Sequence, residues 1–74
     1  MTLEQECVKA LTRHIGPAAQ SFLARQCKYH LNKEPVMLQT SDIDELAKWC
    51  HIGVSLTINK IVAEKVKQDI LALK

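Results

Sequence analysis

Aromatic residues and glycines are scarce in this sequence. Aromatic side chains make up 4% of the 74 residues, so the core must be built from aliphatic side chains, as in packed helices. The two glycines, Gly16 and Gly53, lie too far apart to form a glycine-rich phosphate-binding loop. No apolar stretch approaches the roughly 18 residues of a membrane-spanning helix. We therefore expect neither a phosphate-loop enzyme nor a membrane protein.

The cysteines do not form the dense, even-numbered set that is typical of a secreted disulfide framework. There are three of them, Cys7, Cys27 and Cys50, and they are widely spaced. The first residues after Met1 are Thr-Leu-Glu-Gln-Glu, which lack the basic and then apolar run of a signal peptide. We therefore expect a cytoplasmic protein with reduced thiols.

The chain is short, and its 74 residues predict a single domain that covers residues 1–74. Hydrophobic residues account for 47% of the chain, which is enough for a core and argues against disorder. One core of this size supplies only about 3–5 kcal/mol of stability. Burial of further apolar surface against a second copy or another protein would add to that stability.

Apolar residues recur with helical spacing along most of the chain. The sequence therefore predicts a compact all-α domain of four helices in two antiparallel hairpins. Thr2 and Gln5 have the spacing of a capping box for the first helix, and Ser41 is the predicted cap of the third. The apolar period also continues through Gly53, so a single long helix kinked there is the less favoured alternative to separate third and fourth helices. The predicted helices cover residues 3–15, 17–30, 42–52 and 55–73.

Gly16 and Pro17 form the predicted structural corner between the first two helices. Glycine is the usual residue at a left-handed helix stop, and proline suits the first position of a helix. The pair therefore sets the angle at which the two helices meet. The next turn is expected around Asn32, which tolerates the left-handed conformation, and Pro35, which prevents helix continuation.

An apolar trio, Val36-Met37-Leu38, lies outside any helical period. It is interpreted either as a lid pinned onto the small core or as an exposed anchor for a partner, and the lid is favoured. Trp49 lies at the flank of the third helix. These residues are the candidate partner-binding residues Val36, Met37, Leu38 and Trp49.

Cys27 and His30, together with Cys50 and His51, have the residue types of a tetrahedral metal site. Cys27 and Cys50 both fall on apolar stripes, and no recognised zinc spacing is met. We therefore predict no metal and no cofactor. His14 and His30 could act as bases, but neither has a carboxylate at useful spacing in the sequence. We therefore predict that the protein is not an enzyme.

Basic residues are concentrated between residues 7 and 33, a stretch without any acidic residue. The favoured interpretation is a solvated surface of two helices. The alternative is a small nucleic-acid-binding accessory protein that uses helices 1 and 2 as a helix-turn-helix. The basic face in that alternative consists of Lys9, Arg13, Arg25 and Lys28.

Residues 7–25 resemble a small helical domain that is appended to bacterial signalling proteins such as serine/threonine kinases, cyclases and receiver proteins. In that family a helix ends in Ile-Gly-Pro, followed by an alanine, apolar residues and then arginine or lysine. The resemblance implies a regulatory or interaction module and no catalytic residue. We therefore predict a non-catalytic protein-interaction or oligomerisation module of a bacterial cytosol. The matching residues are Ile15, Gly16, Pro17, Ala19, Phe22, Leu23 and Arg25.

Overall fold

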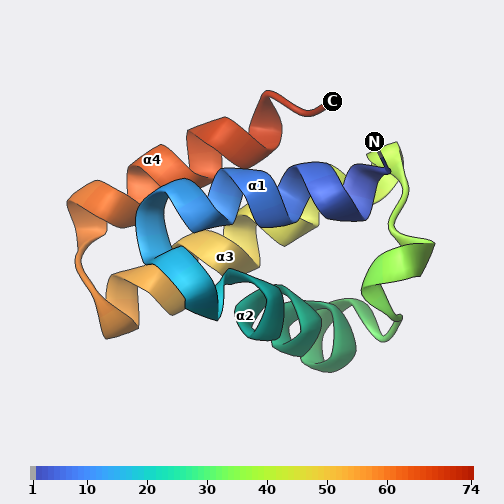
Figure 1. The fold of residues 1–74 in the computed structure, drawn as a ribbon, viewed down its shortest axis with the longest axis horizontal. Coiled ribbons are helices and arrows are strands. Elements are labelled where there is room, and N and C mark those ends of the chain that lie inside the picture. Colours follow the sequence, from blue (N-terminus) through green and yellow to red (C-terminus); the bar gives the residue numbers. More distant parts are fainter. Residues whose placement is uncertain (1) are drawn as a thin grey trace.

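The computed structural model describes residues 2–74, and these residues form helices and turns without any β-strand (Figure 1). The predicted all-α class is confirmed. The longer helices are α1 (Leu3–Ile15), α2 (Ala19–Gln26), α3 (Ile43–Thr57) and α4 (Lys60–Leu71). Short helical turns connect or extend them: η1 (Gly16–Ala18), η2 (Cys27–Leu31), η3 (Pro35–Met37) and η4 (Thr40–Asp42).

Helix α1 begins and ends at the predicted residues because both of its ends are specified locally. The Thr2 hydroxyl accepts a hydrogen bond from the Gln5 backbone N–H at 3.2 Å. The Gln5 side-chain oxygen accepts one from the Thr2 N–H at 3.0 Å, which completes the predicted capping box. Acidic residues in the first turn and basic residues in the last turn match the helix dipole.

The corner after α1 depends on the backbone of Gly16. Its φ of 65° is positive, as predicted, but its ψ of −141° lies outside the left-handed helical region. This combination borders a region that is essentially restricted to glycine. A Cβ atom at this position would meet no other atom within 4 Å, so the need for glycine is purely conformational. Pro17 lies in the 3-10 turn η1, and α2 begins at Ala19 rather than at the predicted residue 17.

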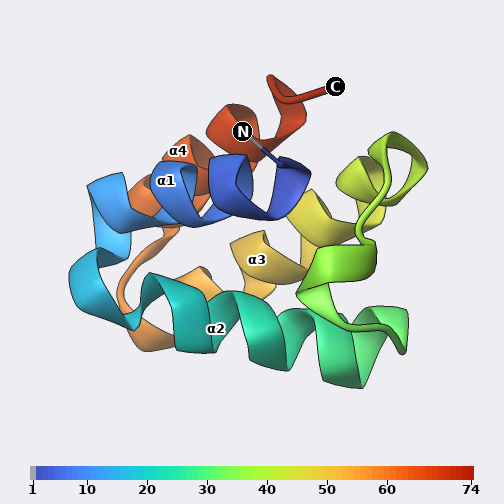
Figure 2. The same ribbon diagram turned by 45° about the vertical axis from the view of Figure 1, so that its right-hand side comes forward.

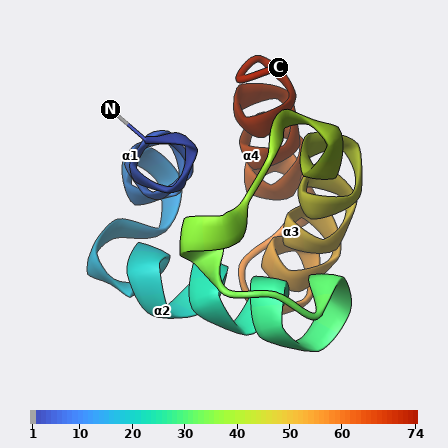
Figure 3. The ribbon, with the colours of Figure 1, turned by 90° about the vertical axis from the view of Figure 1, so that its right-hand side faces the viewer.

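Helix α2 crosses α1 instead of running back alongside it. Viewed along α1, α2 runs across the picture (Figure 3), and in an intermediate view it passes beneath α1 (Figure 2). The predicted antiparallel hairpin of the first two helices is therefore not confirmed. Helices α3 and α4 do run antiparallel and side by side (Figure 1).

The predicted boundary between the third and fourth helices is wrong. Helix α3 continues through Gly53 to Thr57, and α4 begins at Lys60 rather than at residue 55. The break falls at Ile58 and Asn59, so the alternative of one helix kinked at Gly53 is also wrong. Asn59 caps α4, because its side-chain oxygen accepts a hydrogen bond from the Val62 N–H at 2.8 Å.

The predicted cap of the third helix at Ser41 is wrong as well. Ser41 lies within η4, where Gln39 and Asp42 form the capping box. Asp42 also accepts a hydrogen bond from the Lys33 ammonium group at 2.8 Å. The bond to Lys33, with a second one from the Gln39 backbone, lowers the pKa of Asp42.

The left-handed conformation predicted for Asn32 is confirmed, with φ 56° and ψ 42°.

Gly53 lies inside a helix because another helix packs against it. A Cβ atom on Gly53 would stand 2.9 Å from Cε1 and Cζ of Phe22 on α2. The absent side chain therefore allows α2 and α3 to approach closely. The neighbouring Val54 is fully buried, and its burial outweighs the low helix propensity of β-branched residues.

Apart from Phe22 and the three cysteines, the core is aliphatic, as the composition predicts. All of the longer helices contribute to it, and α1 is also tied to α4 by a hydrogen bond between His14 Nε2 and Asp69 Oδ2 at 2.7 Å. The largest fully buried aliphatic side chains are Leu11, Leu23, Ile43, Leu46, Val54, Val66 and Ile70.

We expect Gly16→Ala to lower the free energy of unfolding by about 1–3 kcal/mol, because the added Cβ disfavours the observed backbone conformation although it fits the space. Urea denaturation followed by circular dichroism measures this change. Gln20→Ala, at an exposed site on α2, is the control and should stay within about 0.5 kcal/mol of wild type. A Gly16→Ala protein as stable as the control would contradict the conformational role.

We expect Gly53→Val to destabilise the protein by about 1–3 kcal/mol, because the side chain overlaps the Phe22 ring. Phe22→Leu removes the overlapping ring atoms. In a double-mutant cycle, the cost of Gly53→Val should therefore be smaller in the Phe22→Leu background than in wild type. Equal costs in the two backgrounds would show that Gly53 and Phe22 are not coupled.

Candidate interaction surface

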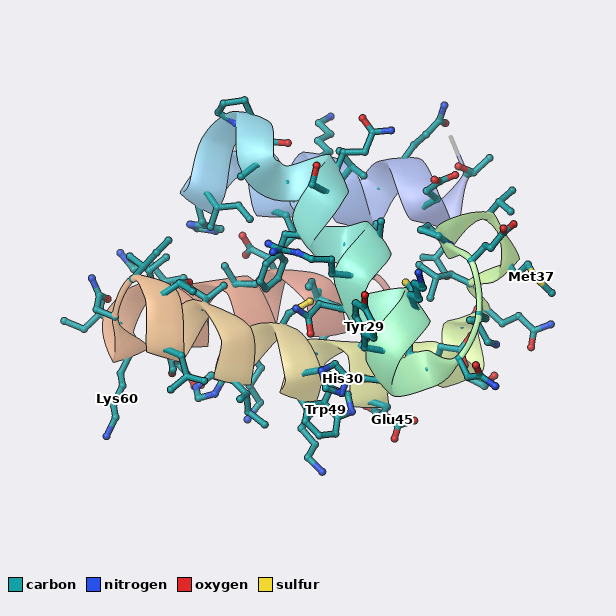
Figure 4. The ribbon with its side chains drawn as sticks, turned by 90° about the horizontal axis from the view of Figure 1, so that it is seen from below. Tyr29, His30, Met37, Glu45, Trp49 and Lys60 are labelled. Atoms are coloured by element: carbon teal, nitrogen blue, oxygen red, sulfur yellow. The ribbon has the colours of Figure 1, made fainter. Side chains whose placement is uncertain are left out.

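A groove of about 480 Å³ lies between α2 and the second half of α3. We call it the α2–α3 groove; Figure 4 views the molecule from the side on which α2 crosses α3. The end of α1 closes the groove through Ile15, and Phe22 lies in its floor against Gly53. Its size and largely apolar lining are typical of ligand- and peptide-binding sites. The apolar lining comes mainly from Ile15, Ala18, Phe22, Tyr29, Leu56 and Ile58.

Large aliphatic side chains project into solvent beside this groove. Leu56 is 82% exposed and Ile61 is 71% exposed, and Ile58 between them is 47% exposed. We call Leu56, Ile58 and Ile61 the apolar ridge. Helix α3 uses Cys50 and Val54 to face the core, so Leu56 falls on its outer side. Several exposed aliphatic side chains close together are typical of an interaction surface, whereas single exposed aliphatic residues are common on any protein.

In the structure, one residue of the predicted apolar trio is buried and the other two are exposed. Leu38 is 8% exposed and belongs to the core, so the lid interpretation fits this residue alone. Val36 and Met37, which are 71% and 58% exposed, lie on η3 beside a second hollow of about 730 Å³. Met37 and Lys60 lie at opposite ends of the molecule (Figure 4), so η3 is remote from the apolar ridge.

Trp49, the remaining predicted partner-binding residue, packs against the chain itself. Its ring stacks on His30 with the centroids 3.9 Å apart and the planes 8° from parallel. The Lys48 ammonium group lies 5.1 Å from the centroid of the indole ring. The indole N–H is buried without a hydrogen-bond partner in residues 2–74. Trp49 and Met37 lie apart in Figure 4, so the four predicted residues do not form one site.

The four residues of the predicted basic face are also dispersed. Lys9 borders a small hollow together with Glu4 and Gln5 of α1. Arg13 lies 3.7 Å from the carboxylate of Asp69 on α4. Arg25 lines the α2–α3 groove, whereas Lys28 borders the hollow beside η3, where Glu4 and Glu34 are its neighbours.

The cysteines lie in the core and are free thiols. Burial raises the pKa of Cys7 to about 12 and that of Cys27 to about 11, and it raises the pKa of Cys50 further still. A protonated, buried thiol is a poor nucleophile and a poor metal ligand. Within residues 2–74, no group of three or more histidine, cysteine or acidic side chains is arranged to hold a metal ion.

His14, for which the sequence shows no carboxylate at useful spacing, has a carboxylate partner in the structure, and so does His51. His14 binds Asp69, which is 55 residues away in the sequence, and His51 Nε2 lies 3.4 Å from Glu64 Oε2. No local pattern could have shown these pairs, because they join α1 to α4 and α3 to α4. Both pairs hold helices together at the surface of the bundle.

The chain was compared with family models, curated proteins and solved structures, and none of them matches. Among residues 2–74, the helices are too short or too polar to cross a membrane.

We expect the three thiols to react very slowly with a disulfide reagent at pH 8 in the folded protein, and rapidly after denaturation. Above the ordinary thiol pKa of 9.0 the unfolded chain ionises first, because the folded-state pKa values are higher. Stability should therefore fall as the pH rises above about 9. Timed thiol titration and urea denaturation at several pH values measure both effects. Fast labelling of any cysteine in the native protein would contradict its burial.

Proposed function

We propose that this chain is a non-catalytic protein-interaction module that uses the α2–α3 groove and the apolar ridge. The single observation that carries the proposal is that the groove and the ridge form one surface, because Leu56 and Ile58 line the groove and also belong to the ridge. Apolar surface of this extent on a small domain is typical of a site that a second protein covers.

The energetics support this proposal. Full burial of one large aliphatic side chain contributes about 1.5–3 kcal/mol. Covering Leu56 and Ile61 would therefore add several kcal/mol to a domain whose own core supplies only a similar amount. A partner would gain this energy without any change in the fold, because both side chains already project from ordered helices.

The chemistry of the remaining side chains supports a non-catalytic role. The thiols are buried and protonated, and His14 and His51 are occupied in contacts between helices. The resemblance at the Ile15–Gly16–Pro17 corner and the reduced cysteines support a regulatory role in a bacterial cytoplasm. Nucleic-acid binding is not favoured, because the basic residues proposed for it border different hollows.

We expect Leu56→Ser combined with Ile61→Ser to abolish association while leaving stability within about 1 kcal/mol of wild type, since both side chains are mostly exposed. Light scattering at millimolar protein concentration measures self-association, and quantitative co-purification from the source organism measures other partners. Val36→Ser combined with Met37→Ser is the matched control, because it removes two exposed apolar side chains from η3.

The proposal fails if the wild-type protein is monomeric at millimolar concentration and co-purifies with the same proteins as the Leu56→Ser/Ile61→Ser variant. A gel shift with DNA or RNA at low ionic strength, weakened by changes at Lys9 and Arg25 alike, would favour the nucleic-acid alternative instead.

A further inference from the structure

Both walls of the α2–α3 groove come from parts of the chain that contain no acidic residue. Every aspartate and glutamate lies outside residues 7–33 and 46–63. All of the residues that line the groove fall within these two stretches. The fold therefore packs the acid-free parts of the chain together and places the groove between them.

Arg25 is the one lysine, arginine, aspartate or glutamate among the residues that line the groove. Lys60 follows the ridge residue Ile58 closely in sequence and projects from the same end of the molecule (Figure 4). Arg25 has no acidic partner among residues 2–74, so its charge is available to a ligand.

We propose that the occupant of this groove is an amphipathic helix of another protein, with an apolar face flanked by aspartate or glutamate. This inference rests on the proposed interaction function and identifies the chemistry of the partner. Helix-in-groove binding uses apolar side chains spaced one turn apart. The apolar ridge extends the contact surface beyond the groove itself, which suits a helix better than a small molecule. Carboxylates beside the apolar face would then meet Arg25.

A second copy of the chain fits this surface poorly. In a two-fold symmetric contact the same patch faces itself, so the Arg25 side chains of the two copies would approach each other without any carboxylate between them. Two acidic residues around the start of α3 are engaged within the chain: Asp42 of η4 binds Lys33, and Asp44 binds Lys74. Electrostatic complementarity therefore favours a different, acidic partner.

The test uses three synthetic helical peptides of equal length. The first has leucine at positions i, i+3, i+4 and i+7 and glutamate at the flanking positions. The second has lysine in place of glutamate, and the third has glutamine in place of leucine. Fluorescence anisotropy of labelled peptides measures affinity, and backbone amide chemical shifts of Gly53, Leu56 and Thr57 locate the contact.

We expect the Leu/Glu peptide to bind the wild-type protein at least about tenfold more tightly than either of the other two. Arg25→Glu should lower the affinity for the Leu/Glu peptide by at least about tenfold, and the variant should bind the Leu/Lys peptide more tightly than the Leu/Glu peptide. Lys9→Glu makes the same charge change beside a different hollow and should alter the affinity by less than about twofold.

A second pair of variants tests the shape of the site rather than its charge. Ala18 and Ala24 are both exposed, but only Ala18 lines the groove. Ala18→Phe should fill the groove and lower the affinity for the Leu/Glu peptide by at least about tenfold. Ala24→Phe should change this affinity by less than about twofold. Thermal unfolding establishes that both variants fold.

The possible failures are distinguishable. Equal binding of the Leu/Glu and Leu/Lys peptides overturns the acidic partner and leaves the interaction function standing. If the protein self-associates and Ala18→Phe abolishes this self-association, the groove binds a second copy of the chain. That result also overturns the acidic partner and leaves the interaction function standing. If none of the peptides binds and the protein neither self-associates nor captures a partner through the ridge, both proposals fail.

Discussion

The close contact between Gly53 and Phe22 determines how the two halves of this domain fit together. Two atoms of the Phe22 ring lie 2.9 Å from the position that a Cβ atom of any other residue would occupy. This contact lets α2 cross α3 at short distance without interrupting α3. It also places Phe22 in the floor of the α2–α3 groove, so the same pair of residues stabilises the core and shapes the candidate binding surface.

The polar contacts between different elements lie nearer the surface than this packing. His14 and Asp69 join α1 to α4, and Lys33 and Asp42 join the turn after η2 to η4. Polar pairs that are partly exposed in this way add little stability, because solvent screens them. The apolar contacts of the core supply most of the stability.

Local signals predict only part of this fold. The sequence specifies α1 correctly, because Thr2 and Gln5 cap its start and Gly16 ends it. The His-Ile-Gly sequence of residues 14–16 recurs at residues 51–53, yet the helix continues there. A glycine stops a helix where its backbone adopts a positive φ, as Gly16 does. Gly53 instead remains helical and packs against Phe22 of α2. The residues that neighbour Gly53 in the sequence do not predict such a long-range contact.

The candidate site is even less predictable from the sequence, for the same reason. The groove joins residues 15–30 to residues 53–58, and only the crossing of α2 over α3 brings them together. The predicted antiparallel hairpin would have placed α2 alongside α1 instead. Asp69 is likewise found as the partner of His14 only when α4 is seen to pack against α1. The sequence does show the acid-free stretch from residue 7 to 33, which becomes one wall of the groove.

The residues that carry the Ile-Gly-Pro resemblance divide into two groups in the structure. Gly16 needs its unusual backbone, and Ala19 and Leu23 are buried, so this group is explained by the fold alone. Ile15, Phe22 and Arg25 line the α2–α3 groove. Folding requires a corner and a buried helix face, but it does not require an arginine at the rim of an apolar groove. Under the proposed function, Arg25 is the residue of this pattern whose side chain would meet the partner.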